Sequence, residues 1–337
     1  MELLTSREED LARAAQALRE GKLVAIPTET VYGLGANAFD ETALARIFEV
    51  KARPTFDPLI VHIASIDDLA KVAARVPPQA RKLAEALWPG PLTIILPKRA
   101  EVPDLVTSGL HTVAVRFPRN DIARRIIALS GTVVAAPSAN PFGYISPTTA
   151  QHVVSMLGDK VDFIVDGGAC DVGVESTVID MTGEIPTIVR PGGMTVETIE
   201  QVIGPVRIVQ KTSGPVVSPG QTLSHYAPRT PLYLFEEESL PRAALALFRD
   251  AGQQELPHPS VALVFDRIRA RELDAYHVFD AVEVLSPSRT MREAAARLFS
   301  LLHEFDARGY AAIFVEKVPE EGLGRAINDR LFRASRK

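Results

Sequence analysis

The chain has 337 residues, a formal net charge of -5 and an apolar fraction of 46%. Length and composition are typical of a globular protein with about two domains, and the acidic balance argues against a surface devoted to nucleic acid. The single cysteine, Cys170, excludes an internal disulfide, and no apolar run is long enough to cross a bilayer. The N-terminus shows no signal peptide. We therefore expect a cytoplasmic protein without membrane association.

Over residues 1–204, short apolar runs rich in β-branched residues alternate with helical patterns. Helices are expected at 41–50, with Asp40 as N-cap, and at 121–129. Strands are expected to begin at Leu23, Leu59, Leu92, Thr112, Thr132 and Asp162. This alternation predicts an α/β or α+β domain around a twisted mixed open sheet.

The composition changes near Gly204. Residues 205–230 are rich in Gly, Pro, Ser and Thr, which disfavours helix and predicts a linker. Residues 231–337 then show a strand, a helix, a strand, a long helix at 290–308 and a strand. This order predicts a smaller Rossmann-like α/β domain with parallel strands. Its first strand is not followed by GxGxxG, so dinucleotide binding is not expected.

Two early segments carry candidate ligand-binding groups. PTETVYGLG follows the first expected strand and includes the Thr30 hydroxyl; a tight strand-to-helix turn is the alternative interpretation. Lys51 and Arg53 follow the next helix, and two cations at such a position suit phosphate or carboxylate oxygens. Cations at helix ends also compensate the helix dipole, so this pattern alone is weak.

Arg116 lies inside an otherwise apolar strand, TVAVRF. If buried, it needs an anionic partner, which could be a structural carboxylate or that of a substrate. His62 alternates with apolar neighbours and, by pattern alone, is a satisfied strand histidine. Polar residues also follow later strands in APSAN, YISP, GVEST and VRPGG. Histidine and cysteine spacings predict no zinc site, and neither GxSxG nor a Walker P-loop is present.

Taken in order, these segments resemble the YrdC/Sua5 family of threonylcarbamoyl-AMP synthases. The linker motif SPGQTLSHYAP and the tail GLGRAINDRLFRA resemble the long, two-domain Sua5 form. The resemblance implies an L-threonylcarbamoyladenylate synthase, a nucleotidyltransferase that forms threonylcarbamoyl-AMP and pyrophosphate from L-threonine, bicarbonate or CO₂, and ATP. The product would feed a downstream tRNA threonylcarbamoyl transferase, for threonylcarbamoyl-adenosine (t6A) in tRNA.

The resemblance also implies roles for matching residues. The catalytic residues would be Lys51, Arg53, Ser138 and Asn140. L-threonine would contact Thr30, His62, Arg116, Ala136 and Ser176. ATP would contact Arg53, Asp57, Thr112, Ser138, Ser146 and Arg190, with the linker residues His225 and Tyr226 closing over the nucleotide. Mg²⁺ would arrive on the ATP phosphates and need no protein cage of its own.

Two positions depart from the family pattern. Where relatives often have glycine this chain has Ala52, which is expected to be harmless if its backbone is helical. Where relatives often have asparagine it has Asp57, whose carboxylate would repel ATP unless Mg²⁺ or Arg53 neutralises it. Glu29 and Glu175 flank the motifs, but nothing in the sequence makes either a general base.

Other functions stay open at this point. An RNA-binding module without catalysis is the main alternative, although the acidic balance counts against it, and direct tRNA binding is undecided. A carbamoyl-transfer enzyme of hydrogenase maturation would need paired CxxC motifs, which one cysteine excludes. An ATP-sensing scaffold is a third alternative.

Overall fold

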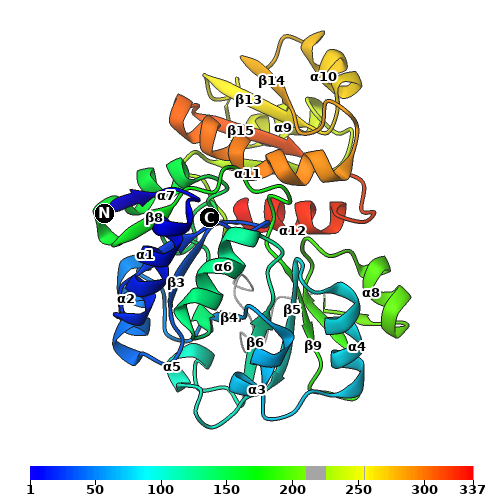
Figure 1. Ribbon diagram of the computed structural model, residues 1–337. Coiled ribbons are helices and arrows are strands. Elements are labelled where there is room, and N and C mark those ends of the chain that lie inside the picture. The colour runs from blue at the N-terminus through cyan, green and yellow to red at the C-terminus, as the bar shows by residue number, and fades with distance from the viewer. Residues whose placement is uncertain (210–224, 254, 337) are drawn as a thin grey trace. The chain divides into compact units, whose positions relative to one another are not determined.

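The computed structural model describes residues 1–209, 225–253 and 255–336 (Figure 1). The chain forms two compact units. Unit 1 comprises Met1–Phe142 and Ser146–Thr222, and unit 2 comprises Gly143–Ile145 and Leu223–Lys337. Most of the expected linker at 205–230 lies outside the described residues, so the linker stays a prediction. No helix in the described part of the chain is long and apolar enough to cross a membrane.

Unit 1 is built on an eleven-stranded mixed sheet with the order β1-β8-β2-β3-β7-β4-β6-β5-β9-β10-β11. This confirms the mixed open sheet predicted from the sequence. In chain order its strands are β1 (Glu2–Leu4), β2 (Val24–Ile26), β3 (Gly33–Asn37), β4 (Ile60–His62), β5 (Leu92–Pro97), β6 (Thr112–Arg116), β7 (Val134–Ala135), β8 (Phe163–Val165), β9 (Thr177–Asp180), β10 (Thr187–Arg190) and β11 (Arg207–Ile208).

The two helices expected in unit 1, at 41–50 and 121–129, are α2 and α6, and both begin and end close to the expected positions. Asp40 caps α2, since its side chain accepts a hydrogen bond from the Ala43 amide at 3.0 Å. The α-helices are α1 (Glu8–Arg19), α2 (Glu41–Lys51), α3 (Leu69–Val72), α4 (Pro78–Leu87), α5 (Asp104–Thr107), α6 (Asp121–Ser130), α7 (Ala150–Leu157) and α8 (Val196–Ile203), with 3₁₀ turns at η1 (Ile66–Asp68) and η2 (Gly158–Lys160).

The alternative interpretation of PTETVYGLG, a tight strand-to-helix turn, is wrong. PTETVYGLG does not turn into a helix but connects β2 to the antiparallel strand β3. Its glycines make this strand fit, because a Cβ at Gly33 would lie 3.1 Å from the Cβ of Ala136, and one at Gly35 would lie 3.0 Å from Val134. The hairpin therefore brings the Thr30 segment directly against the loop that follows β7.

Unit 2 is a smaller α/β domain with an all-parallel sheet in the order β12-β15-β13-β14. This confirms the predicted Rossmann-like domain. Its strands are β12 (Leu232–Phe235), β13 (Ser260–Val264), β14 (Ala281–Val284) and β15 (Ala312–Glu316), and its helices are α9 (Arg242–Asp250), α10 (Arg267–Asp274), α11 (Met291–Arg308) and α12 (Gly324–Ala334). The long helix expected at 290–308 is α11, with Thr290 as N-cap and Gly309 as left-handed C-cap.

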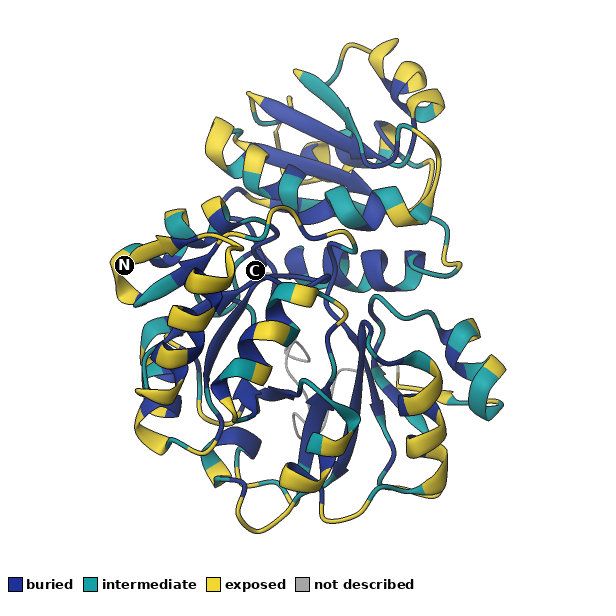
Figure 2. Cartoon of the chain, in the orientation of Figure 1, coloured by how far each residue is buried: buried dark blue, intermediate teal, exposed yellow. Residues whose placement is uncertain are grey.

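Burial follows the layering within each unit (Figure 2). The strands are mostly buried, whereas exposed residues gather on the outer faces of the helices. In unit 2 the ring of Phe314 packs against Tyr233, Phe248 and Phe279 at centroid distances of 5.5, 5.8 and 5.3 Å. In unit 1 one face of the central strands carries only a small apolar cluster, and polar side chains occupy the rest.

Candidate active site

The floor of the candidate site is one face of the strands β4, β6, β5 and β9. In the strand register His62 pairs with Arg116, and Arg116 pairs with Thr93, so these side chains form one row. A small apolar cluster continues the same face: Ile60, Ile95, Ala114 and Val178. Thr112 stands on this face at the other end of β6, about 13 Å from Arg116 at the usual rise of a strand.

Lys51, the last residue of α2, is held inside the loop that follows β7. Its Nζ donates to the backbone carbonyls of Ser138, at 2.5 Å, and Asn140. Its own carbonyl accepts from the Phe142 amide at 2.8 Å. Lys51 is 1% exposed, and burial, followed by the neighbouring Arg53, holds its pKa well below the ordinary value. Three of the four residues expected to be catalytic therefore lie in contact.

Arg53 joins the same cluster through the turn that follows α2. Its guanidinium donates to the carbonyls of Asp57, at 3.0 Å, and Pro58, at 2.9 Å. Its Nη2 also lies 2.9 Å from Oδ2 of Asp57, in an ion pair that is almost fully buried. Burial raises the pKa of Asp57 against the opposing attraction of three cations: Arg53, Lys51 and Arg190.

The backbone of Ala52 differs from the expectation. Ala52 caps α2 with φ 49° and ψ 41°, a left-handed rather than a helical conformation. Its amide bonds to the carbonyls of Phe48 and Glu49, which ends the helix and turns Arg53 inward. A glycine adopts this conformation without strain, whereas alanine pays about 1 kcal/mol. The substitution is therefore tolerated but not neutral.

Arg116 has the anionic partner that its burial required. Its Nη2 lies 2.9 Å from Oε1 of Glu29, which comes from the segment between β2 and β3. No role was predicted for Glu29; the signal that could have found it was the need of a buried arginine for a carboxylate. Burial first, and Arg116 second, lower the pKa of His62 to about 3, so the neighbouring imidazole is neutral.

Ser176, Arg190 and Ser146 connect the two halves of the cluster. Ser176 lies 2.7 Å from the Thr93 hydroxyl, beside Arg116 in the row, and also accepts from Arg190 at 3.2 Å. Arg190 donates in addition to the Ser176 carbonyl at 2.8 Å. Ser146 donates to Glu175 at 2.5 Å. The glycine turn after Arg190 makes this approach feasible, because a Cβ at position 192 would lie 2.3 Å from the Glu175 carbonyl.

The remaining expected site residues of unit 1 line the same region. Thr30 is fully buried beside Thr28, with 2.9 Å between their hydroxyls. The Ala136 amide donates to the Ile60 carbonyl at 2.9 Å, which places it next to His62. All four buried cations predicted from the motifs therefore gather on one side of unit 1: Lys51, Arg53, Arg116 and Arg190.

His225 and Tyr226 lie in unit 2. Tyr226 is 1% exposed, its ring lies 5.7 Å from that of Phe299, and the Arg330 guanidinium lies 5.1 Å from its centroid. The His225 ring packs on Tyr226 at 4.1 Å. Their predicted closure over the nucleotide stays a prediction. The rest of the motif SPGQTLSHYAP before His225 lies outside the described residues.

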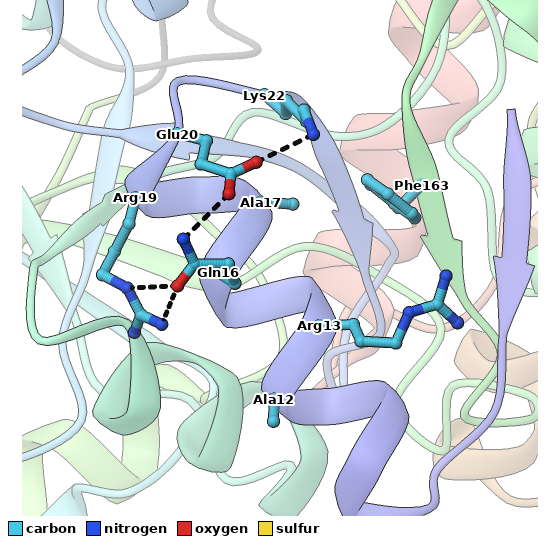
Figure 3. Close-up of a pocket in the computed structure, with 8 residues that line it drawn as sticks. All are labelled: Ala12, Arg13, Gln16, Ala17, Arg19, Glu20, Lys22 and Phe163. Atoms are coloured by element: carbon cyan, nitrogen blue, oxygen red, sulfur yellow. Dashed lines mark hydrogen bonds and ion pairs between the residues drawn. The ribbon is translucent and has the colours of Figure 1, made fainter.

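A separate pocket on α1 of unit 1 does not belong to this cluster (Figure 3). Its charged side chains are paired with neighbours, as the Nζ of Lys22 lies 2.8 Å from Glu20, and Arg13 lies 2.6 Å from Glu2. In the described part of the chain, no three His, Cys, Asp or Glu side chains are placed to hold a metal ion.

Two family models match the chain. The Sua5, YciO and YrdC model, described as telomere recombination, matches residues 16–192. A model described as the C-terminal domain of threonylcarbamoyl-AMP synthase matches residues 194–336.

Curated proteins and a solved structure are similar over nearly the whole chain. Threonylcarbamoyl-AMP synthase of Pyrococcus abyssi is 44% identical, over 96% of this chain and 93% of the relative. That of Bacillus subtilis is 40% identical, over 98% and 94%. The crystal structure of P. abyssi Sua5 complexed with L-threonine is 43% identical, with a TM-score of 0.87 over 99% of this chain and 97% of that one.

Proposed function

The chain belongs to the Sua5/YrdC family and makes threonylcarbamoyl-AMP, and we propose that it does so by nucleotidyl transfer in the cluster described above. The carrying observation is a continuous set of contacts: Lys51 donates to Ser138 and Asn140 in the loop after β7, Arg53 pairs with Asp57, and Ser176 connects Arg190 to the row that holds Arg116. This arrangement favours catalysis over RNA binding without turnover.

At one end of the cluster, we assign L-threonine to Arg116, His62, Thr30, Ala136 and Ser176. The Arg116 guanidinium offers a planar set of donors for the α-carboxylate. Because His62 is neutral, it can hydrogen-bond the substrate without adding charge. The hydroxyls of Thr30 and Ser176 suit the polar groups of a small hydroxylated amino acid.

At the other end, we assign ATP to Arg53, Ser138, Ser146, Arg190 and Thr112, with Lys51 and Asn140 beside the reacting phosphorus. The cations neutralise the triphosphate, and the apolar cluster towards Thr112 suits the flat, weakly polar part of a nucleotide. Arg53 neutralises Asp57, so that carboxylate need not repel the phosphates. His225 and Tyr226 stay assigned to closure over the nucleotide.

Mg²⁺ fits this site as a companion of ATP rather than as a resident ion. Asp57 lies among these phosphate-side cations and already pairs with Arg53, and the Glu175 carboxylate already accepts a hydrogen bond from Ser146. Mg²⁺ ordinarily keeps several waters and binds through phosphate oxygens with one or two carboxylates. It would supply charge neutralisation on the phosphates, and the chain's own residues do the positioning.

The reaction balances without a cofactor. The ammonium of threonine and bicarbonate give a carbamate, water and one proton. A carbamate oxygen then forms a bond to the α-phosphorus of ATP, while the bond from that phosphorus to the pyrophosphate oxygen breaks. Such a displacement needs alignment and charge stabilisation more than acid–base chemistry, and Lys51, Arg53 and Arg190 are placed to provide both.

The product is a reactive mixed anhydride. We propose that it passes to a downstream tRNA threonylcarbamoyl transferase, in the cytoplasm where tRNA and ATP meet. Direct contact of this chain with tRNA is not part of the proposal.

The direct test follows labelled bicarbonate into an adenylate, with ATP, Mg²⁺ and each amino acid in turn. Label should enter only with L-threonine. Lys51→Met should abolish incorporation of the label. Calorimetry should show that the variant still binds threonine, because Lys51 lies in the phosphate half of the cluster. Lys22→Met, on the separate α1 pocket, is the matched control and should keep full activity. Full incorporation by a folded Lys51→Met variant would remove the assignment.

A further inference from the structure

Glu29 and Arg116 form a buried pair whose hydrogen-bonding capacity is not fully used: Arg116 and the amides of Glu29 and Arg119 lie close enough to stabilise the Glu29 carboxylate, but none is well aligned with it. Their side chains are 2% and 5% exposed, and one carboxylate oxygen lies 2.9 Å from one guanidinium nitrogen. Among the residues that the structure describes, neither Glu29 oxygen has an aligned hydrogen bond, and the same holds for Nε and Nη2 of Arg116. Buried polar groups are normally satisfied, so this pair has spare acceptors on one side and spare donors on the other.

The spare capacity matches an amino-acid zwitterion. An α-carboxylate would accept from Arg116, and the α-ammonium on the same carbon would donate to Glu29. A zwitterion leaves the net charge of the buried pair unchanged. A carboxylate without an amino group would bring one uncompensated negative charge into the same space, which is unfavourable in a buried site.

The groups around Glu29 keep its carboxylate ionised, so it carries the negative charge of the threonine half of the site. Burial opposes its ionisation, but Arg116, together with the backbone amides of Glu29 and Arg119, outweighs burial and lowers the pKa of Glu29. His62 is neutral because its pKa is lowered to about 3. Burial raises the pKa of the Cys170 thiol, and the Glu29 charge adds to that shift. The backbone of Glu29 is held in place, because its carbonyl accepts a hydrogen bond from the Val172 amide at 2.8 Å.

We propose that Glu29 is a substrate-binding residue that accepts hydrogen bonds from the α-ammonium of L-threonine while Arg116 holds the α-carboxylate. This inference rests on the proposed role of Arg116 in threonine binding. It makes the pair a filter that selects amino acids over acids lacking an amino group. Carboxylation of the amine removes its positive charge, so Glu29 then repels the carbamate towards the cations around Asp57.

Calorimetric titration of the wild-type protein and Glu29→Gln tests the filter with two ligands. One is L-threonine, and the other is (R)-3-hydroxybutyrate, which is threonine with hydrogen in place of the amino group. Glu29→Gln should weaken threonine binding about 10-fold or more, through loss of a charged hydrogen bond. It should strengthen binding of the acid, because Arg116 is then without a counter-ion. An unchanged ratio of the two affinities would overturn the proposal.

Two further variants keep the result interpretable. Glu29→Asp retains the charge but retracts it by one methylene, so threonine should bind more weakly without any gain for the acid; it also serves if Glu29→Gln does not fold. Arg116→Met separates the two levels of inference. If Arg116→Met no longer binds either ligand but the ratio of the two affinities is unchanged in Glu29→Gln, only the role of Glu29 is refuted. Unchanged binding of both ligands in Arg116→Met refutes the threonine site itself.

Discussion

Each unit contains an arginine–glutamate pair with a buried carboxylate, and the two pairs are bonded differently. In unit 2 the Arg269 guanidinium donates to Glu316 twice, at 2.9 and 2.7 Å, and the Leu240 amide donates to the same carboxylate at 2.7 Å. In unit 1 Glu29 and Arg116 approach to 2.9 Å without aligned hydrogen bonds at the atoms that meet. The first pair is complete as it stands, whereas the second keeps its donors and acceptors for a ligand.

The difference separates structural from binding charges more clearly than burial does. Glu316 and Glu29 are 2% and 3% exposed, so exposure alone would not distinguish them. The two carboxylates differ in how many hydrogen bonds they make within the protein. A buried charge with all its hydrogen bonds made stabilises the fold, whereas one without them can bind the polar groups of a ligand. The variants below test that contrast from the largest expected effect to the smallest.

Removing the arginine of each pair should give opposite phenotypes. Arg116→Met should lower the rate of threonylcarbamoyl-AMP formation about 1000-fold, because the substrate carboxylate loses its anchor and Glu29 loses its counter-ion. Arg269→Met should destabilise unit 2 and leave threonine affinity unchanged at temperatures where the protein is folded. The contrast fails if Arg269→Met weakens threonine binding as much as Arg116→Met.

Removing the carboxylate of the complete pair should act on stability. Glu316→Gln leaves Arg269 with a weaker partner and should lower the free energy of unfolding by about 2–3 kcal/mol. Denaturant unfolding followed in unit 2 measures this. Threonine affinity should stay within about twofold of the wild-type value, which is the experimental scatter expected for a remote site.

Arg53 and Asp57 form a third pair that sharpens the comparison. Burial raises the pKa of Asp57 above the value of 3.8 for the free side chain. The folded state therefore holds the Asp57 proton more tightly than the unfolded chain, and the ionised carboxylate lowers stability above pH 3.8. Asp57→Asn removes this cost but leaves the buried Arg53 guanidinium without its counter-ion, so the stability of the variant relative to the wild type should rise as the pH rises from 3.8 towards neutrality, as measured by denaturant unfolding at a series of pH values.

The same variant should tighten ATP binding. Asparagine removes a negative charge near the triphosphate and releases Arg53, so the KM for ATP should fall about three- to tenfold. A rise in this KM would instead mean that Asp57 contributes to Mg²⁺ binding. Steady-state kinetics at saturating threonine, with Mg²⁺ in excess, distinguish the two outcomes.

The smallest effect concerns the backbone that places Arg53. Ala52→Gly should raise the free energy of unfolding by about 0.5–1 kcal/mol, because Ala52 has a positive φ. The matched control is Ala12→Gly on the exposed side of α1, which should lower stability by about the same amount. A loss of stability in Ala52→Gly would show that its conformation is not strained.

The sequence predicted what periodicity and turn chemistry determine. The strands that begin near Leu23, Leu59, Leu92, Thr112, Thr132 and Asp162, the helices α2 and α6, the Asp40 cap and the parallel sheet of unit 2 follow from local patterns. Motif order located the cations of the site. Contacts between distant segments could not be predicted from local patterns. Glu29 and Arg116 are far apart in the chain, and β3 forms only because Gly33 and Gly35 fit against the loop after β7. The left-handed Ala52 was missed because alanine normally signals helix.

Chemical rescue of stability tests the contrast between the two pairs most directly. The thermal unfolding midpoints of Glu29→Gln and Glu316→Gln would be measured without (R)-3-hydroxybutyrate and with a concentration that saturates Glu29→Gln. A ligand that binds only the folded protein at about 100 times its Kd stabilises it by about 2.7 kcal/mol. The midpoint of Glu29→Gln should rise, because the acid replaces the missing carboxylate beside Arg116, while that of Glu316→Gln should not move. Equal shifts in both variants, or none in Glu29→Gln, would contradict the assignment of the Glu29–Arg116 pair to substrate binding.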